Sequence, residues 1–114
     1  MNNTSADAGG GGSAIINING TGNQMLRGSG GRSRGPFPNI TIDKPSGTLT
    51  LASIVVMAAG TTWDYKQGIV NASSNQSEVV FSTGCKVQSD GLPNGMKFHN
   101  VALGYGCNSS GTDI

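Results

Sequence analysis

The stretch Phe37-Pro38-Asn39-Ile40-Thr41-Ile42 decides the fold, because the chain returns to it as Phe98-His99-Asn100-Val101-Ala102-Leu103. Both copies read aromatic, any residue, Asn, β-branched, small and aliphatic. A short apolar run that ends in glycine precedes each copy. Self-similarity of this kind is typical of a chain built from stacked, like units. We therefore expect the apolar members of both copies to be equivalent core positions, namely Phe37, Ile40, Ile42, Phe98, Val101 and Leu103.

The asparagines of the two copies, Asn39 and Asn100, are predicted to stand at corners of the fold. An asparagine at a corner can stack its amide on neighbouring turns. The alternation also changes phase here, because Ile40 and Ile42 share a parity that Phe37 lacks. A bend or bulge must lie between them if all three are buried. Otherwise the phenylalanine covers an outer edge.

Short alternating segments and turn residues predict an all-β fold. Strand starts recur about every seven to ten residues, with Gly, Pro, Asn or Ser between them, and no segment shows a sustained helical period. Such spacing suits a short parallel β-solenoid or a β-sandwich or jelly roll. The repeat favours the solenoid, with turns of roughly 20 residues. Trp63 and Tyr65 share the parity of Thr61, which does not decide whether they are buried, and we favour core positions for both over an exposed platform for sugar.

Residues 36–104 carry a resemblance to a known class of repeat. The run from Pro36 to Leu51, followed by Trp63-Asp64-Tyr65, Gly68-Ile69-Val70 and Glu78-Val79-Val80-Phe81, resembles the β-solenoid-type repeats of bacterial surface adhesins and phage tail-fibre or virion proteins. The resemblance implies a structural module of stalks, fibres and surface arrays. This chain departs from the pattern by its length of about one and a half repeats and by an Arg/Gly insertion before the first copy.

The chain divides into three parts. Residues 1–12 are predicted to be a flexible Gly-rich arm, residues 13–106 the β-rich domain with an Arg/Gly loop at 27–35, and residues 107–114 a polar tail. A short solenoid exposes the strand edges of its first and last turns, and open edges bind other strands. We therefore expect a homo-oligomer or larger assembly.

The composition fits an extracellular β-rich protein, and we expect the protein at a virion surface, outside a cell or on a cell surface. The chain has 114 residues, 19 glycines, 11% charged residues and a formal net charge of +1. This balance disfavours nucleic acid as a partner, and no apolar run approaches the roughly 20 residues of a membrane helix. The start of the chain lacks the basic and apolar regions of a signal peptide. We expect prior processing, excision from a longer protein or export without the Sec route, as for a virion protein.

The cysteines and the asparagines of the sequence suggest two covalent features. Cys85 and Cys107 form a candidate disulfide, worth about 3 kcal/mol, or else two unpaired thiols. Asn-x-Ser/Thr sequences are more frequent than the roughly two expected by chance. They indicate glycosylation or, more simply, the Asn, Ser and Thr of turns in a β-rich chain. The sequence leaves open whether the protein binds a surface glycan.

Nothing in the sequence indicates catalysis, a cofactor or a metal site. The one histidine, His99, lies in a predicted strand without a nucleophile pattern. The acids are scattered, and only a pair such as Asp43 and Asp64 could supply the two carboxylates that a glycosidase requires.

A loop with three arginines, Arg27, Arg32 and Arg34, lacks the aromatic residues that stack on nucleic-acid bases. We interpret it as a solvated or subunit-contacting loop.

These observations predict a non-enzymatic structural or attachment protein. The first expectation is a virion surface component, such as a phage fibre or capsid decoration protein. The alternative is a subunit of a bacterial cell-surface or extracellular filament or adhesin, and a carbohydrate-active β-helix enzyme is a remote third.

Overall fold

The computed structural model describes residues 1, 13–89 and 96–104, and these form an all-β structure without a helix. All of its strand pairs are parallel. The predicted short parallel β-solenoid is thereby confirmed, with about three turns. Its strands are β1 (Ile15–Ile18), β2 (Gln24–Arg27), β3 (Asn39–Ala52), β4 (Ile54–Met57), β5 (Thr62–Asn71), β6 (Glu78–Phe81), β7 (Lys86–Ser89) and β8 (Asn100–Leu103).

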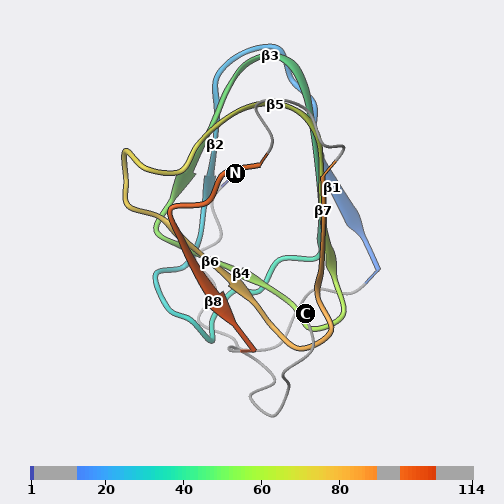
Figure 1. Ribbon diagram of the computed structural model, residues 1–114, viewed down its shortest axis with the longest axis vertical. Coiled ribbons are helices and arrows are strands. Elements are labelled where there is room, and N and C mark those ends of the chain that lie inside the picture. The colour runs from blue at the N-terminus through green and yellow to red at the C-terminus, as the bar shows by residue number, and fades with distance from the viewer. Residues whose placement is uncertain (2–12, 90–95, 105–114) are drawn as a thin grey trace.

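The strands form two sheets that enclose the core on three sides. Sheet A has the order β1-β3-β5-β7, with β2 also paired to β3, and sheet B has the order β4-β6-β8. The long strands β3 and β5 bend near their middle, at the top of Figure 1. Sheet A therefore supplies two sides of the cross-section and sheet B the third. The bend coincides with a break in the β3–β5 register between Asp43 and Thr48.

Successive turns stack in register with a longer period than predicted. Ile16 pairs with Ile40, Ile40 with Trp63, and Trp63 with Val87, so one turn takes 24, 23 and 24 residues in sheet A. The expected length of about 20 residues is wrong. Each turn must supply three sides as well as the bend and the corners that join them.

The corner between the second and third sides changes from one turn to the next. Ser53 alone separates β3 from β4, and it adopts a left-handed conformation with a φ of 62°, which a non-glycine residue rarely adopts. One turn later a loop fills the same corner. In this loop Ser77 Oγ donates to Ala72 O at 2.8 Å, and Ser74 N donates to Asn71 Oδ1 at 3.1 Å. The solenoid therefore tolerates insertions at this corner without losing register in sheet B.

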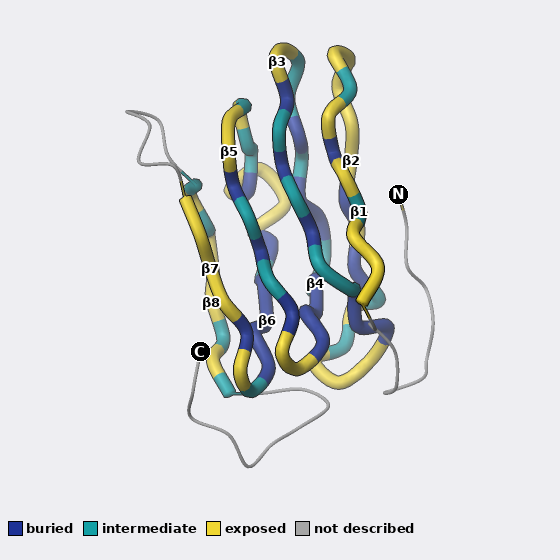
Figure 2. The backbone as a smooth tube through the Cα atoms, turned by 90° about the vertical axis from the view of Figure 1, so that its right-hand side faces the viewer, coloured by how far each residue is buried: buried dark blue, intermediate teal, exposed yellow. Residues whose placement is uncertain are grey.

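The core lies between the two sheets and consists of stacked apolar side chains. Phe37, Ile40 and Ile42 are buried as predicted, and Trp63 and Tyr65 are core residues, which confirms the favoured interpretation. Figure 2 shows these buried positions alternating along β3 and β5. The full cluster comprises Ile18, Leu26, Phe37, Ile40, Ile42, Leu49, Leu51, Val55, Met57, Trp63, Tyr65, Ala72, Val79, Phe81 and Cys85.

Three aromatic rings close the core toward the C-terminal end. The Trp63 and Phe81 rings are 6.2 Å apart, Trp63 and Phe98 are 5.7 Å apart, and Phe81 and Phe98 are 5.6 Å apart, with tilted or edge-on geometry. Edge-on pairs at such distances stabilise a core beyond the area that they bury. Phe98 is partly buried and packs against the cluster, so the segment before β8 belongs to the core.

The equivalence of the two sequence copies is wrong. Ile40 and Ile42 lie in sheet A, whereas Val101 and Leu103 lie in β8 of sheet B. Ile40 and Ile42 are fully buried, but Val101 and Leu103 are 45% and 60% exposed. The interval between the copies is not a whole number of turns, so the second copy lies on another side of the coil. A six-residue alternating motif fits a strand on any of the three sides of the solenoid, so it does not tell on which side the strand lies.

We expect Ile42→Ala to lower the stability of the protein far more than Thr41→Ser. Ile42 is fully buried, and truncating such a residue usually costs about 2–5 kcal/mol. Thr41 points to the opposite side of the same strand and is only partly buried. Thermal unfolding of both variants measures the difference. Equal and small shifts in melting temperature would contradict the inward position of Ile42.

Candidate interaction surface

The C-terminal end of the solenoid presents open strand edges. β7 and β8 are the last strands of their sheets, and within the described residues no strand pairs with their outer edges. All four residues of β7 are exposed. Val87, Val101 and Leu103 are exposed as well, although they stack on the buried Trp63, Val79 and Phe81. They face the core side of the coil, and no strand of the described residues stacks on them.

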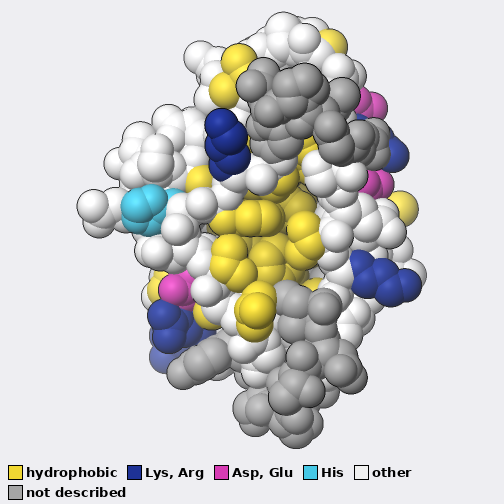
Figure 3. Space-filling model, in the orientation of Figure 1, with side chains coloured by type: hydrophobic (Ala, Val, Ile, Leu, Met, Phe, Trp, Pro, Cys, Tyr) yellow, Lys and Arg dark blue, Asp and Glu magenta, His cyan; other side chains and the backbone are white. Residues whose placement is uncertain are grey.

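Figure 3 looks onto this end and shows hydrophobic side chains gathered in its centre. A cavity of about 590 Å³ lies beside β8, where the second half of β5 pairs with β3 but not with β7. Ile69, Val70 and Phe98 give it an apolar lining, and Lys97 and His99 supply nitrogen groups. His99 is exposed and stands just before β8, which corrects its predicted place in a strand.

At the opposite end of the solenoid, two inward side chains are covered, although within the described residues no strand pairs with the outer edge of β1. Ile18 and Leu26, which point inward from β1 and β2, are buried although they belong to the first turn. Met1 pairs with the outer edge of β2: its amino group donates to Met25 O at 2.7 Å, and Arg27 N donates to Met1 O at 3.0 Å. The two ends therefore differ, since the inward residues are covered at one end and exposed at the other.

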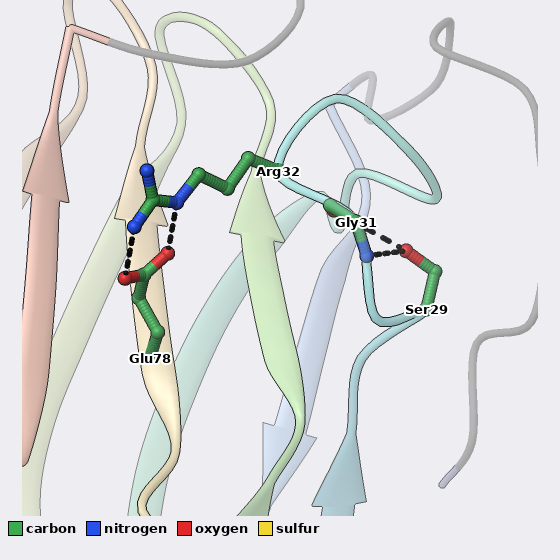
Figure 4. Close-up of polar contacts among 4 residues, drawn as sticks. All are labelled: Ser29, Gly31, Arg32 and Glu78. Carbon is green, nitrogen blue, oxygen red and sulfur yellow. Dashed lines mark hydrogen bonds and ion pairs between the residues drawn. The ribbon is translucent and has the colours of Figure 1, made fainter.

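The Arg/Gly loop packs on sheet B instead of projecting freely. Arg32 makes a two-pronged ion pair with Glu78 at the start of β6, with nitrogen–oxygen distances of 2.6 and 2.8 Å (Figure 4). Ser29 Oγ orders the same loop, because it accepts from Gly31 N and donates to Arg34 O. Gly28 lies so close to the Ile54 carbonyl that a side chain there would overlap it.

Of the three arginines predicted to contact another subunit, Arg32 therefore pairs with Glu78 of its own chain. Its side chain is 46% exposed, so the ion pair holds the loop in place more than it stabilises the fold. Arg27 ends β2 in the first turn, and both Arg27 and Arg34 are exposed. Contact of these two with another subunit stays a prediction.

Asn39 joins three turns through its side chain. Its Nδ2 donates to Ala14 O at 3.0 Å in the turn before, and its Oδ1 accepts from Thr62 N at 2.9 Å in the turn after. The amide thus supplies the ladder bonds where β3 begins. Asn100 also begins a strand, and its backbone N donates to Ser77 O at 3.1 Å. Its side chain is exposed in the last turn.

Lys44 is a buried cation at the bend of sheet A, and the sequence patterns do not reveal it. Its ammonium donates to Gly20 O, Gly22 O and Gln24 Oε1 at 2.6, 2.8 and 2.7 Å. The residue is 1% exposed. Three acceptors satisfy all three donors of the ammonium. Gly68 of the next turn packs on Lys44 with a φ of +123°, where a Cβ would come within 2.9 Å of the lysine Cβ.

Cys85 is a free, buried thiol within the core. Its Sγ lies 3.1 Å from Ala58 O, to which it donates, and 3.7 Å from Thr61 Oγ1. Cys107 lies outside the described residues, so its half of the candidate disulfide is not described, whereas Cys85 is an unpaired thiol, as the alternative to the disulfide expects. The predicted arm at 2–12 and the tail at 107–114 lie outside them as well.

The candidate acidic pair takes structural partners. Asp43 Oδ1 accepts from Gln67 Nε2 at 2.7 Å, and Asp64 lies 3.4 Å from the ammonium of Lys66. Among residues 13–89 and 96–104, no three His, Cys, Asp or Glu side chains gather as metal ligands. In the same part of the chain no helix is long and apolar enough to cross a membrane.

No family model, curated protein or solved structure matches the chain. The class therefore rests on the fold itself, which is that of a short parallel β-solenoid. Its two ends differ in the burial of their inward side chains, because Ile18 and Leu26 are buried whereas Val87, Val101 and Leu103 are exposed.

We expect Asn39→Ala to destabilise the fold and Asn100→Ala to leave it nearly unchanged. The first substitution leaves Ala14 O and Thr62 N without the partners described above, at a cost of about 1–3 kcal/mol. The second removes an exposed side chain, for which about 0.5 kcal/mol or less is usual. Urea unfolding of the two variants provides the comparison. Similar losses in both would show that Asn39 does not bridge the turns.

Lys44→Met should also destabilise the protein, because it removes the ammonium and leaves three partly buried hydrogen bonds at the bend unmade. We expect a loss of about 2–4 kcal/mol. Lys86→Met is the matched control, since Lys86 is exposed in β7. Calorimetric melting of both variants tests the expectation. If Lys44→Met melts no earlier than the control, the ammonium does not hold the bend.

Proposed function

We propose that this protein is a non-enzymatic structural or attachment component of a virion surface, such as a fibre or capsid decoration protein, and that it self-associates through β-rich contacts. The observation that carries the proposal is the open C-terminal end. There the edges of β7 and β8 and the apolar side chains of Val87, Val101 and Leu103 face solvent. Contact with another strand edge would bury both.

Two further features support an assembly role. The β8 sequence Asn-Val-Ala-Leu contains neither charge nor proline, which are the residues that usually protect an edge strand from pairing. The resemblance of residues 36–104 to tail-fibre and adhesin repeats points to the same kind of role.

A subunit of a bacterial cell-surface or extracellular filament is the second candidate. The excess of Asn-x-Ser/Thr sequences favours it, and two of these asparagines, Asn19 and Asn75, are exposed. Imaging of the native assembly separates the two candidates, because one requires a virion and the other a cell-surface filament.

Leu103→Lys should weaken self-association, and Ile15→Lys should not. Both residues are 60% exposed, but Leu103 lies at the open end and Ile15 in the first turn. Loss of one buried leucine contact costs about 1.5–3 kcal/mol, which raises the dissociation constant roughly tenfold or more. Light scattering across a concentration series gives the masses. A wild-type protein that stays monomeric, or two variants that behave alike, would contradict assembly through this end.

A further inference from the structure

The turn that follows β1 begins with Asn19 and Gly20. It is the only place in the described residues where an asparagine precedes a glycine. Glycine has no Cβ, so its backbone nitrogen can approach the side chain of the residue before it. Asparagine is itself one of the thermally labile residues of proteins. This pair is therefore where a side-chain amide of the described chain can react most readily with the backbone.

Both reacting groups are accessible in the structure. Asn19 is exposed, and within the described part of the chain neither its side-chain amide nor the backbone N–H of Gly20 makes a hydrogen bond. Asn39, by contrast, uses both its amide oxygen and its amide nitrogen, and Asn75 Nδ2 donates to Leu51 O at 3.4 Å. The fold thus holds these two amides in place and leaves that of Asn19 able to turn toward Gly20.

We propose that Asn19 and Gly20 form a self-modification site, at which the chain loses ammonia and converts Asn19 to isoaspartate. The Gly20 nitrogen gives its proton to water and attacks Cγ of Asn19. The new carbon–nitrogen bond closes a cyclic succinimide, while the bond from Cγ to Nδ2 breaks and Nδ2 takes a proton from solvent and leaves as ammonia.

Water then opens the succinimide at either of its two carbonyl carbons. Opening at the backbone carbonyl of Asn19 leaves Gly20 attached through Cγ, which is isoaspartate, and opening at Cγ gives ordinary aspartate. Overall, water is consumed and ammonia is released. The reaction therefore needs no enzyme, oxidant or reductant.

The modification acts on the hydrogen bonds that hold Lys44. Gly20 O and Gln24 Oε1 accept from the Lys44 ammonium at 2.6 and 2.7 Å. The Gln24 amide lies against Gly20, since a Cβ on Gly20 would lie 3.0 Å from Gln24 Oε1. Isoaspartate adds one carbon to the main chain ahead of Gly20, an extension of about 1.5 Å. A hydrogen bond does not tolerate such a displacement, so Gly20 O leaves the ammonium and the first turn loosens from β3.

This inference goes beyond the proposed function and needs neither a partner nor self-association. It makes the hold of Lys44 on the first turn depend on the age of the molecule. Older copies then unfold more readily than fresh ones, whatever they assemble into.

Ageing the purified full chain at mildly alkaline pH and body temperature tests the chemistry. Peptide mass spectrometry with electron-transfer fragmentation locates each deamidated residue and distinguishes isoaspartate from aspartate. We expect Asn19 to convert well before Asn39 and Asn75 do. Gly20→Ala should slow the conversion, because a Cβ hinders the approach of the nitrogen. A folded chain that keeps Asn19 intact, while the same chain unfolded in urea converts it, overturns the proposal.

A melting comparison tests the consequence for Lys44. It uses an Asn94→Ala background, because the other Asn-Gly pair of the chain, Asn94-Gly95, lies outside the described residues. We expect the aged fraction that contains isoaspartate to melt earlier than fresh protein. Fresh Asn19→Asp, which has the charge of the product and a normal main chain, should melt later than that fraction.

The matched variant for this comparison is Lys44→Met, in which ageing should cause no further shift because the ammonium is already absent. If that variant does not fold, Gln24→Ala takes its place and should show a smaller ageing shift than the unsubstituted chain. An aged fraction that melts like fresh protein, or an undiminished ageing shift in these variants, overturns the link to Lys44. Self-association is measured separately by mass in solution, so its failure leaves this inference standing.

Discussion

Parallel pairing between successive turns is the constraint on which this structure depends. Because the turns stack in register, each side chain lies above its counterpart one turn earlier, as Ile40 lies between Ile16 and Trp63. Inward positions of the inner turns are therefore mostly apolar, and in sheet A the intervening residues such as Thr41 and Asp64 are partly exposed. In sheet B the intervening Val56 and Val80 are buried as well. Stacked inward residues can differ in size, since Trp63 stacks on Ile40 and its ring packs against Phe81 and Phe98.

The same constraint explains the polar residues that the core requires. Where the backbone bends or enters a strand, its N–H and C=O groups leave the regular ladder and still need partners. Lys44 satisfies two such carbonyls at the bend, and Asn39 satisfies one carbonyl and one amide at the strand entry. Both side chains act between turns. They therefore hold the stack together where the backbone cannot do so alone.

How much of this could be predicted from the sequence depends on how local each feature is. The all-β class and the inward positions of Ile42 and Trp63 follow from alternation over a few residues, so they could be predicted. The length of the turn could not, because it depends on how the bends and corners are closed. Nor could the pairing of Arg32 with Glu78, which lie 46 positions apart and meet only because the loop crosses sheet B. The burial of Lys44 contradicts the usual exposure of lysine, and no spacing rule reveals acceptors in the preceding turn.

The exposure of Val101 and Leu103 shows where sequence reasoning fails for a reason that bears on function. Their alternation is as regular as that of Ile40 and Ile42, and their side chains point toward the core side in the same way. What differs is that no described strand pairs with the outer edge of β8, and a strand pattern cannot report this. In a stack an inner turn has two neighbours, whereas β8 has a core-like sequence with one described neighbour. A strand that lacks edge-protecting residues and carries apolar side chains of core type can pair with a neighbouring strand, and the proposed self-association is placed at this end for that reason.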